Sequence, residues 1–230
     1  MVDEILALKR NKTYTLVKLP PRRTAIGCKW VDPKLISHYT VALNAKYALK
    51  DLGDLHFFLG IKVTSTSGGL HLSQAKCIRD LLHKAKMDEA KPSNTPMVSG
   101  LKLSAYGSSL VDNPHMYKSI VRVLQYLVIT RLEISFSVNK VCQLMANPLQ
   151  SHWHVVKRIL RYLSGTIDYG IHLIKLDHLD LTAFCDADWA TDLDDKCSNS
   201  GFTIFFGCNL IAWQCNKQHI VSRSSTEAEF

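Results

Sequence analysis

The alternation of apolar and polar positions is clearest toward the end of the chain. Residues 181–186 alternate between two faces and end on Asp186, which predicts a strand that carries a terminal carboxylate. Two apolar runs follow, Gly201–Gly207 and Leu210–Trp213, and the two residues between them suit a tight hairpin. Ser224 with Glu227 three residues later indicates the start of a helix. The pattern therefore predicts a strand, a hairpin and a helix, in that order.

An earlier part of the chain predicts a second hairpin. His56–Val63 and Gly69–Leu72 read as strands on either side of Thr64–Gly68. Ser73 is then expected to cap a helix over Gln74–Lys86. Three apolar residues of that helix recur at helical spacing and predict a buried stripe: Ile78, Leu81 and Leu82. A helix is also expected over Ser37–Leu49.

The middle of the chain separates into a polar segment and a helical segment. Residues 88–114 contain three prolines and several Ser and Gly, which is typical of a linker with local extended structure. Amphipathic runs then predict helices over Tyr117–Thr130, Ile134–Met145 and Ser151–Leu163, with Gly165 as the stop of the last. A strand over Tyr169–Leu173 is expected to open the last domain.

Composition narrows the class of protein. The 230 residues are 47% hydrophobic, which is enough for one or two domains with real cores. No apolar run approaches the roughly 18 residues of a membrane span, and the N-terminus lacks the apolar segment of a secretory signal. The seven cysteines form no C-x-x-C pair, which indicates reduced thiols. We expect an intracellular protein, cytoplasmic or nuclear, without a membrane partner.

The formal net charge of +8 is unevenly distributed. Residues 1–175 carry 25 Lys/Arg against 11 Asp/Glu, whereas residues 176–230 carry 3 against 9. A basic body suits phosphate binding and an acidic end suits divalent cations, although a basic balance often serves solubility alone.

The strongest candidate for nucleic-acid contact is the helix predicted over Ser151–Leu163. Lys157, Arg158 and Arg161 share one face of it, which is either a phosphate-binding surface or a solvated helix face. His152 and His154 are a weak candidate for metal binding, since side chains two apart on a helix point in different directions.

Several blocks of the sequence resemble one known family. FCDADWA, SGF, AW and SSTEAEF, within Phe184–Phe230, are similar to the ribonuclease H domain of Pol polyproteins from copia-type LTR retrotransposons. Met1–Val31 resembles the start of that family's reverse transcriptase, and Ala48–Val63 with Gly68–Met87 resembles its end. Tyr117–Pro148 and His152–Ile171 resemble the connection region between the two enzymes.

The resemblance implies an α+β fold made of a reverse-transcriptase remnant without its palm, a helical connection and a truncated ribonuclease H-like domain of mixed β-sheet and helix. The implied boundaries are 1–34 and 35–100 for the two reverse-transcriptase parts, 101–165 for the connection and 166–230 for the ribonuclease H-like part.

The family's polymerase palm is missing from the expected place. In the family, one Asp on an early strand and a Tyr-x-Asp-Asp turn bind two magnesium ions. Between Trp30 and Tyr47 this sequence has a single carboxylate, Asp32, and no adjacent pair of aspartates occurs before Asp194-Asp195. Two-metal nucleotidyl transfer requires carboxylates around both ions. We therefore expect a deleted palm and no polymerase activity.

The ribonuclease H motif implies the remaining catalytic residues. Asp186 and Glu229 match its metal-binding carboxylates, the role of Asp188 stays open, and Glu227 belongs to the helix start. Such sites use four acids and two ions of Mg²⁺ or Mn²⁺, and the other two acids are expected beyond Phe230, so the implied metal site is weak and vestigial. The aspartates at 192, 194 and 195 favour a polar turn over a metal site.

Three functions remain open on the sequence. The favoured one is an inactive fragment of a copia-type Pol polyprotein, with RNA, DNA or an RNA/DNA hybrid as partner. The alternatives are a non-catalytic nucleic-acid-binding protein retained by the host, and a protein that docks on intact, element-encoded Pol.

Overall fold

The computed structural model describes residues 37–39, 41–43, 45, 55–176 and 180–229. The chain divides into two compact units, residues 1–53 and 54–230. In the first unit, residues 37–39, 41–43 and 45 are helical, as the expected helix over Ser37–Leu49 requires. The predictions for Met1–Val31 and the segment of the expected palm deletion up to residue 36 lie outside the described residues.

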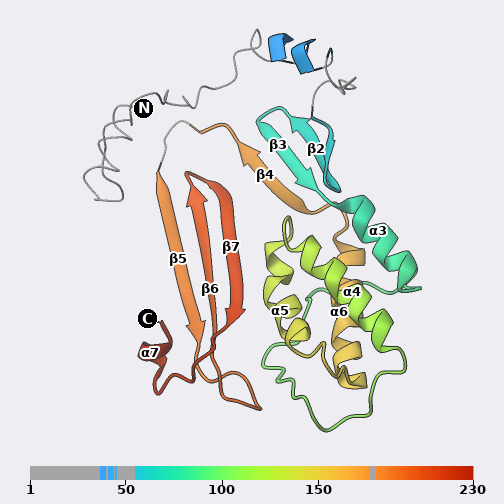
Figure 1. Cartoon of the computed structure of the whole chain (residues 1–230), viewed down its shortest axis with the longest axis vertical. Helices are drawn as coiled ribbons and strands as arrows, with labels where there is room; N and C mark the ends of the chain where they lie inside the picture. The colour runs from blue at the N-terminus through green and yellow to red at the C-terminus, as the bar shows by residue number, and fades with distance from the viewer. Residues whose placement is uncertain (1–36, 40, 44, 46–54, 177–179, 230) are drawn as a thin grey trace. The chain divides into compact units, whose positions relative to one another are not determined.

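The second unit begins with an antiparallel sheet in the order β1-β2-β3-β4 (Figure 1). Its strands are β1 Phe57–Phe58, β2 Ile61–Thr66, β3 Gly69–Ser73 and β4 Gly170–Ile174. The continuous strand expected over His56–Val63 is wrong, because the chain reverses at Leu59 and Gly60, whose φ angles of 46° and 76° are both positive. Two positive φ values match the tight turns that join twisted antiparallel strands. The hairpin expected between β2 and β3 is confirmed.

The fourth strand of this sheet comes from a distant part of the sequence. A strand was expected over Tyr169–Leu173 as the opening of the last domain, but β4 pairs with β3, so it belongs to the first sheet. Glycine makes this pairing feasible: a Cβ on Gly69 would lie 1.9 Å from the carbonyl oxygen of Leu173, and one on Gly170 would lie 2.0 Å from that of Leu72. The backbones therefore approach where only glycine fits.

Four α-helices and a 3₁₀ turn form the helical part: α3 Ala75–Lys84, α4 Pro114–Leu127, η1 Leu132–Ile134, α5 Ser135–Gln143 and α6 Gln150–Gly165. The expected stripe on α3 is buried. The expected Ser73 cap is wrong, since Gln74 occupies that position and Ser73 ends β3. Helix α4 begins three residues before the expected Tyr117, because the Asn113 side chain accepts a hydrogen bond from Met116 N–H at 2.9 Å.

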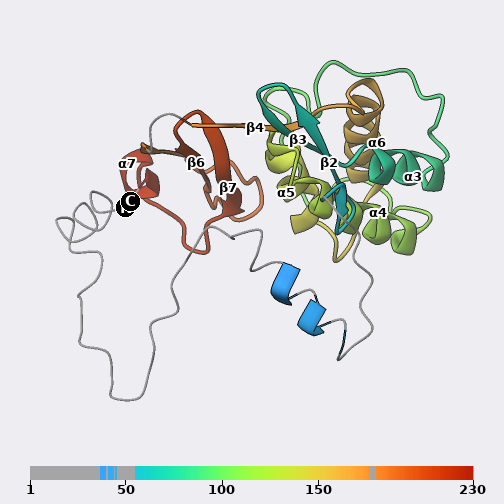
Figure 2. The same cartoon turned by 90° about the horizontal axis from the view of Figure 1, so that it is seen from above.

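These helices enclose the main apolar core. α3 packs on α4 and α6, and α5 packs on the same two helices (Figure 2). Fully buried side chains come from α4 and α6 at helical spacing: Tyr117, Ile120, Val121, Leu124, Leu127, Val156, Ile159, Leu160 and Leu163. The amphipathic periodicity of the sequence thus forms a core between neighbouring helices.

Residues 88–113, which we call the strap, connect α3 to α4. Local extended structure occurs at Leu110, which forms an isolated bridge with Leu149, but the strap is not a free linker, because it is bonded along α6. Ser93 N–H donates to the carbonyl of Arg161 at 3.1 Å, and Gln150 N–H donates to that of Ser109 at 2.9 Å. Val111 of the strap is buried. The strap therefore belongs to the helical part.

The last part is a second antiparallel sheet in the order β5-β6-β7, followed by the short helix α7. The elements are β5 Leu181–Asp188, β6 Asn199–Phe206, β7 Asn209–Lys217 and α7 Ser225–Glu229. The hairpin loop is Gly207–Cys208, one residue earlier than expected, since Phe206 pairs with Asn209. Gly207 has a φ of 56°, which suits such a turn.

The described residues thus have an α+β fold with two antiparallel sheets. No helix among them is long and apolar enough to cross a membrane.

Candidate functional site

Strand β5 presents Asp186 and Asp188 on one face of the second sheet. Directly opposed residues of antiparallel strands share a face, and Asp186 pairs with Gly201, which in turn pairs with Cys215 on β7. Because Gly201 has no side chain, the space beside Asp186 stays open. A cavity of about 310 Å³ lies there, lined by both aspartates, Gly201 and Cys215, and on its far side by η1 and the start of α5.

Helix α5 supplies polar contacts to this face. Asn139 Nδ2 donates to the Cys215 carbonyl at 2.7 Å and so joins α5 to β7. Burial lowers the pKa of Lys140, with Lys217 acting in the same direction and Asp192 and Asp188 opposing it. Lys140 is therefore within electrostatic reach of Asp188. A cation beside a carboxylate reduces the charge available to a metal ion.

The Cys215 thiol lies within the same cavity lining. Burial raises its pKa, and Asp188 adds to the effect while Lys140 opposes it. A thiol with a raised pKa stays protonated near neutral pH and is a poor nucleophile.

Helix α7, which ends on the second predicted carboxylate, Glu229, packs against β5. Glu227 N–H donates to Ser224 Oγ at 3.1 Å, and the Glu227 carboxylate accepts from Arg223 N–H at 2.7 Å, so Ser224 caps the helix and Glu227 lies in its first turn, as expected. Ala228 is buried, whereas Glu229 at the end of α7 is exposed.

Trp189, which follows Asp188, is half exposed, and its indole N–H donates to the Ser222 carbonyl at 2.9 Å.

The predicted metal ligands fit a divalent ion only in part. Carboxylate oxygens suit Mg²⁺, and the exposed Asp186 and Asp188 stand on one strand face. The Asp186 carboxylate accepts a hydrogen bond from Ala187 N–H at 2.9 Å. Across residues 55–176 and 180–229, no three or more His, Cys, Asp or Glu side chains gather closely enough to hold one ion.

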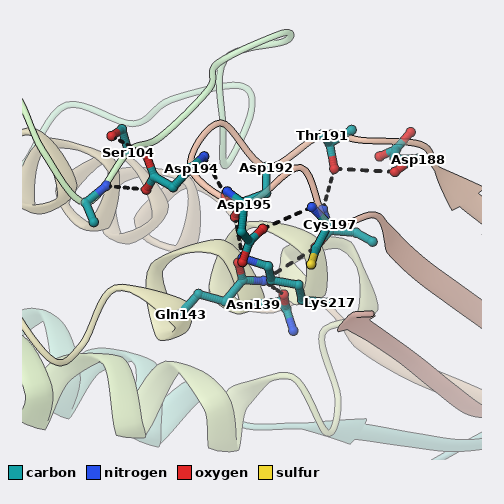
Figure 3. Close-up of polar contacts among 12 residues, drawn as sticks. Ser104, Asn139, Gln143, Asp188, Thr191, Asp192, Asp194, Asp195, Cys197 and Lys217 are labelled. Atoms are coloured by element: carbon teal, nitrogen blue, oxygen red, sulfur yellow. Dashed lines mark hydrogen bonds and ion pairs between the residues drawn. The ribbon is translucent and has the colours of Figure 1, made fainter. Parts of the chain in front are cut away.

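The β5–β6 loop contains the aspartates expected to form a polar turn, and Figure 3 shows their contacts. Lys217 Nζ lies 2.7 Å from a carboxylate oxygen of Asp192 and 2.7 Å from one of Asp195. The Asp194 carboxylate accepts from Ser104 Oγ at 2.6 Å and from Ala105 N–H at 2.7 Å. The turn is confirmed, and in addition it is bonded to the strap.

These contacts shift the pKa values of Asp194, Asp195 and Lys217. The hydrogen bond from Lys217 lowers the pKa of Asp195 to about 2, and that from Ser104 lowers the pKa of Asp194. Burial acts to lower the pKa of Lys217, but the bonds to Asp192 and Asp195 outweigh it and raise the pKa overall. Asp194 and Asp195 are therefore held ionised by donors within the protein.

The basic face predicted on α6 is partly engaged by the strap. Arg158 Nη2 donates to Thr95 Oγ1 at 2.8 Å, and Arg161 Nε donates to the Lys91 carbonyl at 2.7 Å. Lys157 is exposed, and its Nζ lies 5.7 Å from the centroid of the Trp153 ring. Arg158 and Arg161 are half-buried and bonded to the strap, so this helix face is not wholly solvated.

The two histidines of α6 have structural partners. Leu149 N–H donates to Nδ1 of the fully buried His152 at 3.0 Å, so the proton lies on Nε2, which contacts the Ser104 carbonyl at 2.9 Å. His154 Nδ1 lies 2.7 Å from the Gln150 carbonyl oxygen. His152 thus joins the start of α6 to the strap, with both ring nitrogens engaged.

Comparison with known proteins shows to which family the chain is related. The family model for reverse transcriptase (RNA-dependent DNA polymerase) matches residues 32–99. The retrovirus-related Pol polyprotein from transposon RE2 of Arabidopsis thaliana is 44% identical over 199 residues, which cover 86% of this chain. An uncharacterised mitochondrial protein of the same plant is 41% identical over 85% of this chain and 81% of its own length. The chain belongs to the copia-type retrotransposon Pol family.

The extent of these matches differs among relatives. The retrovirus-related Pol polyprotein from transposon TNT 1-94 of Nicotiana tabacum is 36% identical over 86% of this chain. The chain spans 14% of the length of the RE2 polyprotein and 16% of the TNT 1-94 polyprotein. No solved structure gives a significant match.

Sequence reasoning missed the donors that organise the acidic loop. Lys217 ends a strand and Ser104 lies in a polar segment, so neither carries a local motif. The one available signal was the surplus of acids in residues 176–230, which makes each of the three Lys/Arg there a candidate partner.

Proposed function

We propose that the chain is a Pol fragment of reverse transcriptase and ribonuclease H ancestry that binds nucleic acid and has neither polymerase nor hybrid-cleaving activity as a protein of these 230 residues. Its organisation would be the two reverse-transcriptase parts 1–34 and 35–100, the connection 101–165 and the ribonuclease H-like part 166–230. One observation within the chain carries the proposal. Although the chain belongs to the Pol family, its stretch between Trp30 and Tyr47 holds a single carboxylate, Asp32.

The polymerase part of the proposal follows from two-metal chemistry. Nucleotidyl transfer needs two ions about 3.5–4 Å apart, held by several carboxylates. A single aspartate cannot supply both ligand sets. Primer extension on a primed RNA or DNA template, with Mg²⁺ or Mn²⁺, should give no product above a control without protein. Incorporation that survives repurification would overturn this part.

For hybrid cleavage, Asp186, Glu229 and Asp188 are the residues that would hold Mg²⁺ or Mn²⁺. A bound ion would supply Lewis-acid activation of water and of the scissile phosphate. Asp186 and Asp188 offer adjacent carboxylates, but Lys140 lines a cavity together with Asp188 and so brings a positive charge to the same region. We expect a weakly bound, largely hydrated ion.

The cleavage assay measures fragments released from a labelled RNA/DNA hybrid. The chain and its Asp186→Asn variant should be equally silent, and a version extended with the family's following segment is the positive arm. Cleavage by the unextended chain that Asp186→Asn abolishes would show that the site works.

Nucleic-acid binding is the activity that the described structure supports best. Lys157, Arg158 and Arg161 lie on one helix. Arg158 and Arg161 bond to a hydroxyl and a backbone carbonyl, Lys157 lies over the Trp153 ring, and none of the three is found in an ion pair among the described residues. Replacing all three by Ala should weaken binding to every sequence and reduce the salt slope by up to about 0.9 log unit per lost phosphate contact. A matched control removes three charges from α3 and α4: Lys76, Lys118 and Arg122. Equal losses in both variants would mean that only net charge matters.

Docking on intact Pol and retention by the host remain alternatives. Co-purification of the chain with element-encoded Pol after nuclease treatment would favour docking over nucleic-acid binding.

A further inference from the structure

A second cavity, of about 660 Å³, lies between α6 and residues 98–108 of the strap. Its size is within the range of about 300–1,000 Å³ typical of small-molecule sites. It is formed by the strap, whose position is fixed at one point by two bonds: the contact of His152 with the Ser104 carbonyl and the bond from Ser104 Oγ to Asp194. The cavity is thus a built feature of the fold.

Four cations line this cavity: Lys102, Lys157, Arg158 and Arg161. No carboxylate is among its lining residues, and none of the four takes part in the ion pairs found in residues 55–176 and 180–229. Arg158 is held by its bond to Thr95, yet its Nε–H is buried without a hydrogen-bond partner among those residues. A buried donor without a partner is costly, and an anionic oxygen would satisfy it.

The other part of the lining is apolar and aromatic. Leu101 and Leu103 of the strap contribute, together with Val155 of α6 and the Tyr106 ring, which is 78% exposed. A ligand that matches both parts carries a phosphate and a flat, apolar group. An unpaired nucleotide has this chemistry, because a base stacks on aromatic rings while its phosphate meets cations.

We propose that this cavity binds one nucleotide of a single-stranded nucleic acid, with its phosphate at the α6 cations and its base against the strap. The inference rests on the proposed nucleic-acid binding and makes it selective for single strands. A duplex keeps its bases paired, so it reaches only the exposed cations and gains nothing from the apolar wall. The selectivity is independent of base sequence, since every base offers a flat face.

The test is fluorescence anisotropy of the full chain with three labelled probes at one salt concentration: a 12-nucleotide strand, an abasic strand with the same number of phosphates, and a 12-base-pair duplex. We expect the base-containing strand to bind about tenfold more tightly than the abasic strand. Ser151→Phe, which fills the cavity from α6 and removes no charge, should abolish that ratio and leave duplex binding unchanged. Ser151→Ala is the matched control and should retain it.

A second variant tests the proposal even if Ser151→Phe does not fold. Tyr106→Ala removes an exposed ring, so it should fold and still reduce the ratio severalfold. Free nucleoside 5′-monophosphate should compete only at concentrations far above those of the strand. If the monophosphate binds more tightly than the strand, the ligand is a free nucleotide and the strand assignment is wrong.

The outcomes separate the two proposals. Equal binding of the base-containing and abasic strands overturns the cavity proposal and leaves nucleic-acid binding by the chain intact. Binding of none of the three probes overturns both.

Discussion

Replacing Arg131 should destabilise the chain more than any surface substitution. Its side chain is 1% exposed, and its Nε lies 2.6 Å from the Glu133 carboxylate. Nη1 donates to the Thr166 carbonyl at 2.9 Å and Nη2 to the Thr166 hydroxyl at 2.5 Å. The guanidinium also lies over the Tyr162 and Tyr169 rings, at 5.9 and 5.6 Å from their centroids. One side chain thus joins the turn after α4 to the end of α6 and the approach to β4.

The magnitude follows from these contacts. Arg131→Ala removes a fully buried side chain and leaves the Thr166 carbonyl and hydroxyl without their donors, and we expect a loss of about 3–5 kcal/mol. Arg131→Lys keeps the charge but cannot reproduce the planar fork, so we expect a loss of about 2 kcal/mol. Glu133→Gln should cost below about 1 kcal/mol, because Glu133 is 38% exposed and Gln still accepts the bond. Domains of this size are stable by about 5–15 kcal/mol, so the first loss is severe.

Urea unfolding followed by circular dichroism measures these losses. The slope of the free energy of unfolding against urea should be unchanged, with the midpoint lowest for Arg131→Ala and closest to the parent for Glu133→Gln. If Arg131→Ala lies within about 1 kcal/mol of the parent, the contacts at Glu133 and Thr166 do not hold these elements together and the reasoning is refuted.

Three further predictions concern the loop, the core and the second sheet. The folded pKa of Asp195, about 2, is below its unfolded value, so its stabilisation is present above about pH 4 and is lost as the pH falls through 2. The thermal stability of Asp195→Asn should therefore be below the parent's at pH 6 and approach it at pH 2. Ile159→Ala should cost about 2–5 kcal/mol in urea unfolding, since Ile159 is fully buried, whereas the half-exposed Ile129→Ala should cost far less; equal losses would contradict the core assignment. Phe184→Lys on the exposed, unpaired edge of β5 should reduce aggregation in light scattering, and unchanged scattering would mean that this edge is not what associates.

The sequence predicts elements well where the signal is local. The buried stripe of Ile78, Leu81 and Leu82 follows from helical spacing within one turn or two. The same reasoning could not find the partner of β4, because alternation identifies a strand and says nothing of the strand it pairs with. β3 and β4 lie about a hundred residues apart, and the glycines that permit their approach look like ordinary turn residues in the sequence.

Two other differences between the prediction and the structure concern the turn at Leu59 and the strap. Leu59 stands at a positive φ, which a residue with a Cβ rarely adopts, so the sequence favoured one strand where the structure has two. Gly60 was the available signal. The strap was expected to be a linker because prolines and serines dominate it, but its backbone groups find partners on α6, and composition does not report on partners in tertiary structure.

The acidic residues within residues 180–229 fall into two groups, according to whether a donor of the protein binds their carboxylates. Asp192, Asp194 and Asp195 are the densest acidic cluster in the sequence, yet each binds a protein donor, Lys217 or Ser104. Their charges therefore hold the β5–β6 loop to β7 and to the strap. Asp186 differs: among the described residues, the hydrogen bond found for its carboxylate comes from Ala187 N–H, and a cavity opens beside it over Gly201. An acid that faces open space with so little compensation is better placed to meet a cation from solution than one already paired. Under the proposal above, Asp186 and none of the loop aspartates is therefore the carboxylate that would meet a metal ion, while the loop aspartates keep the strand ends in place.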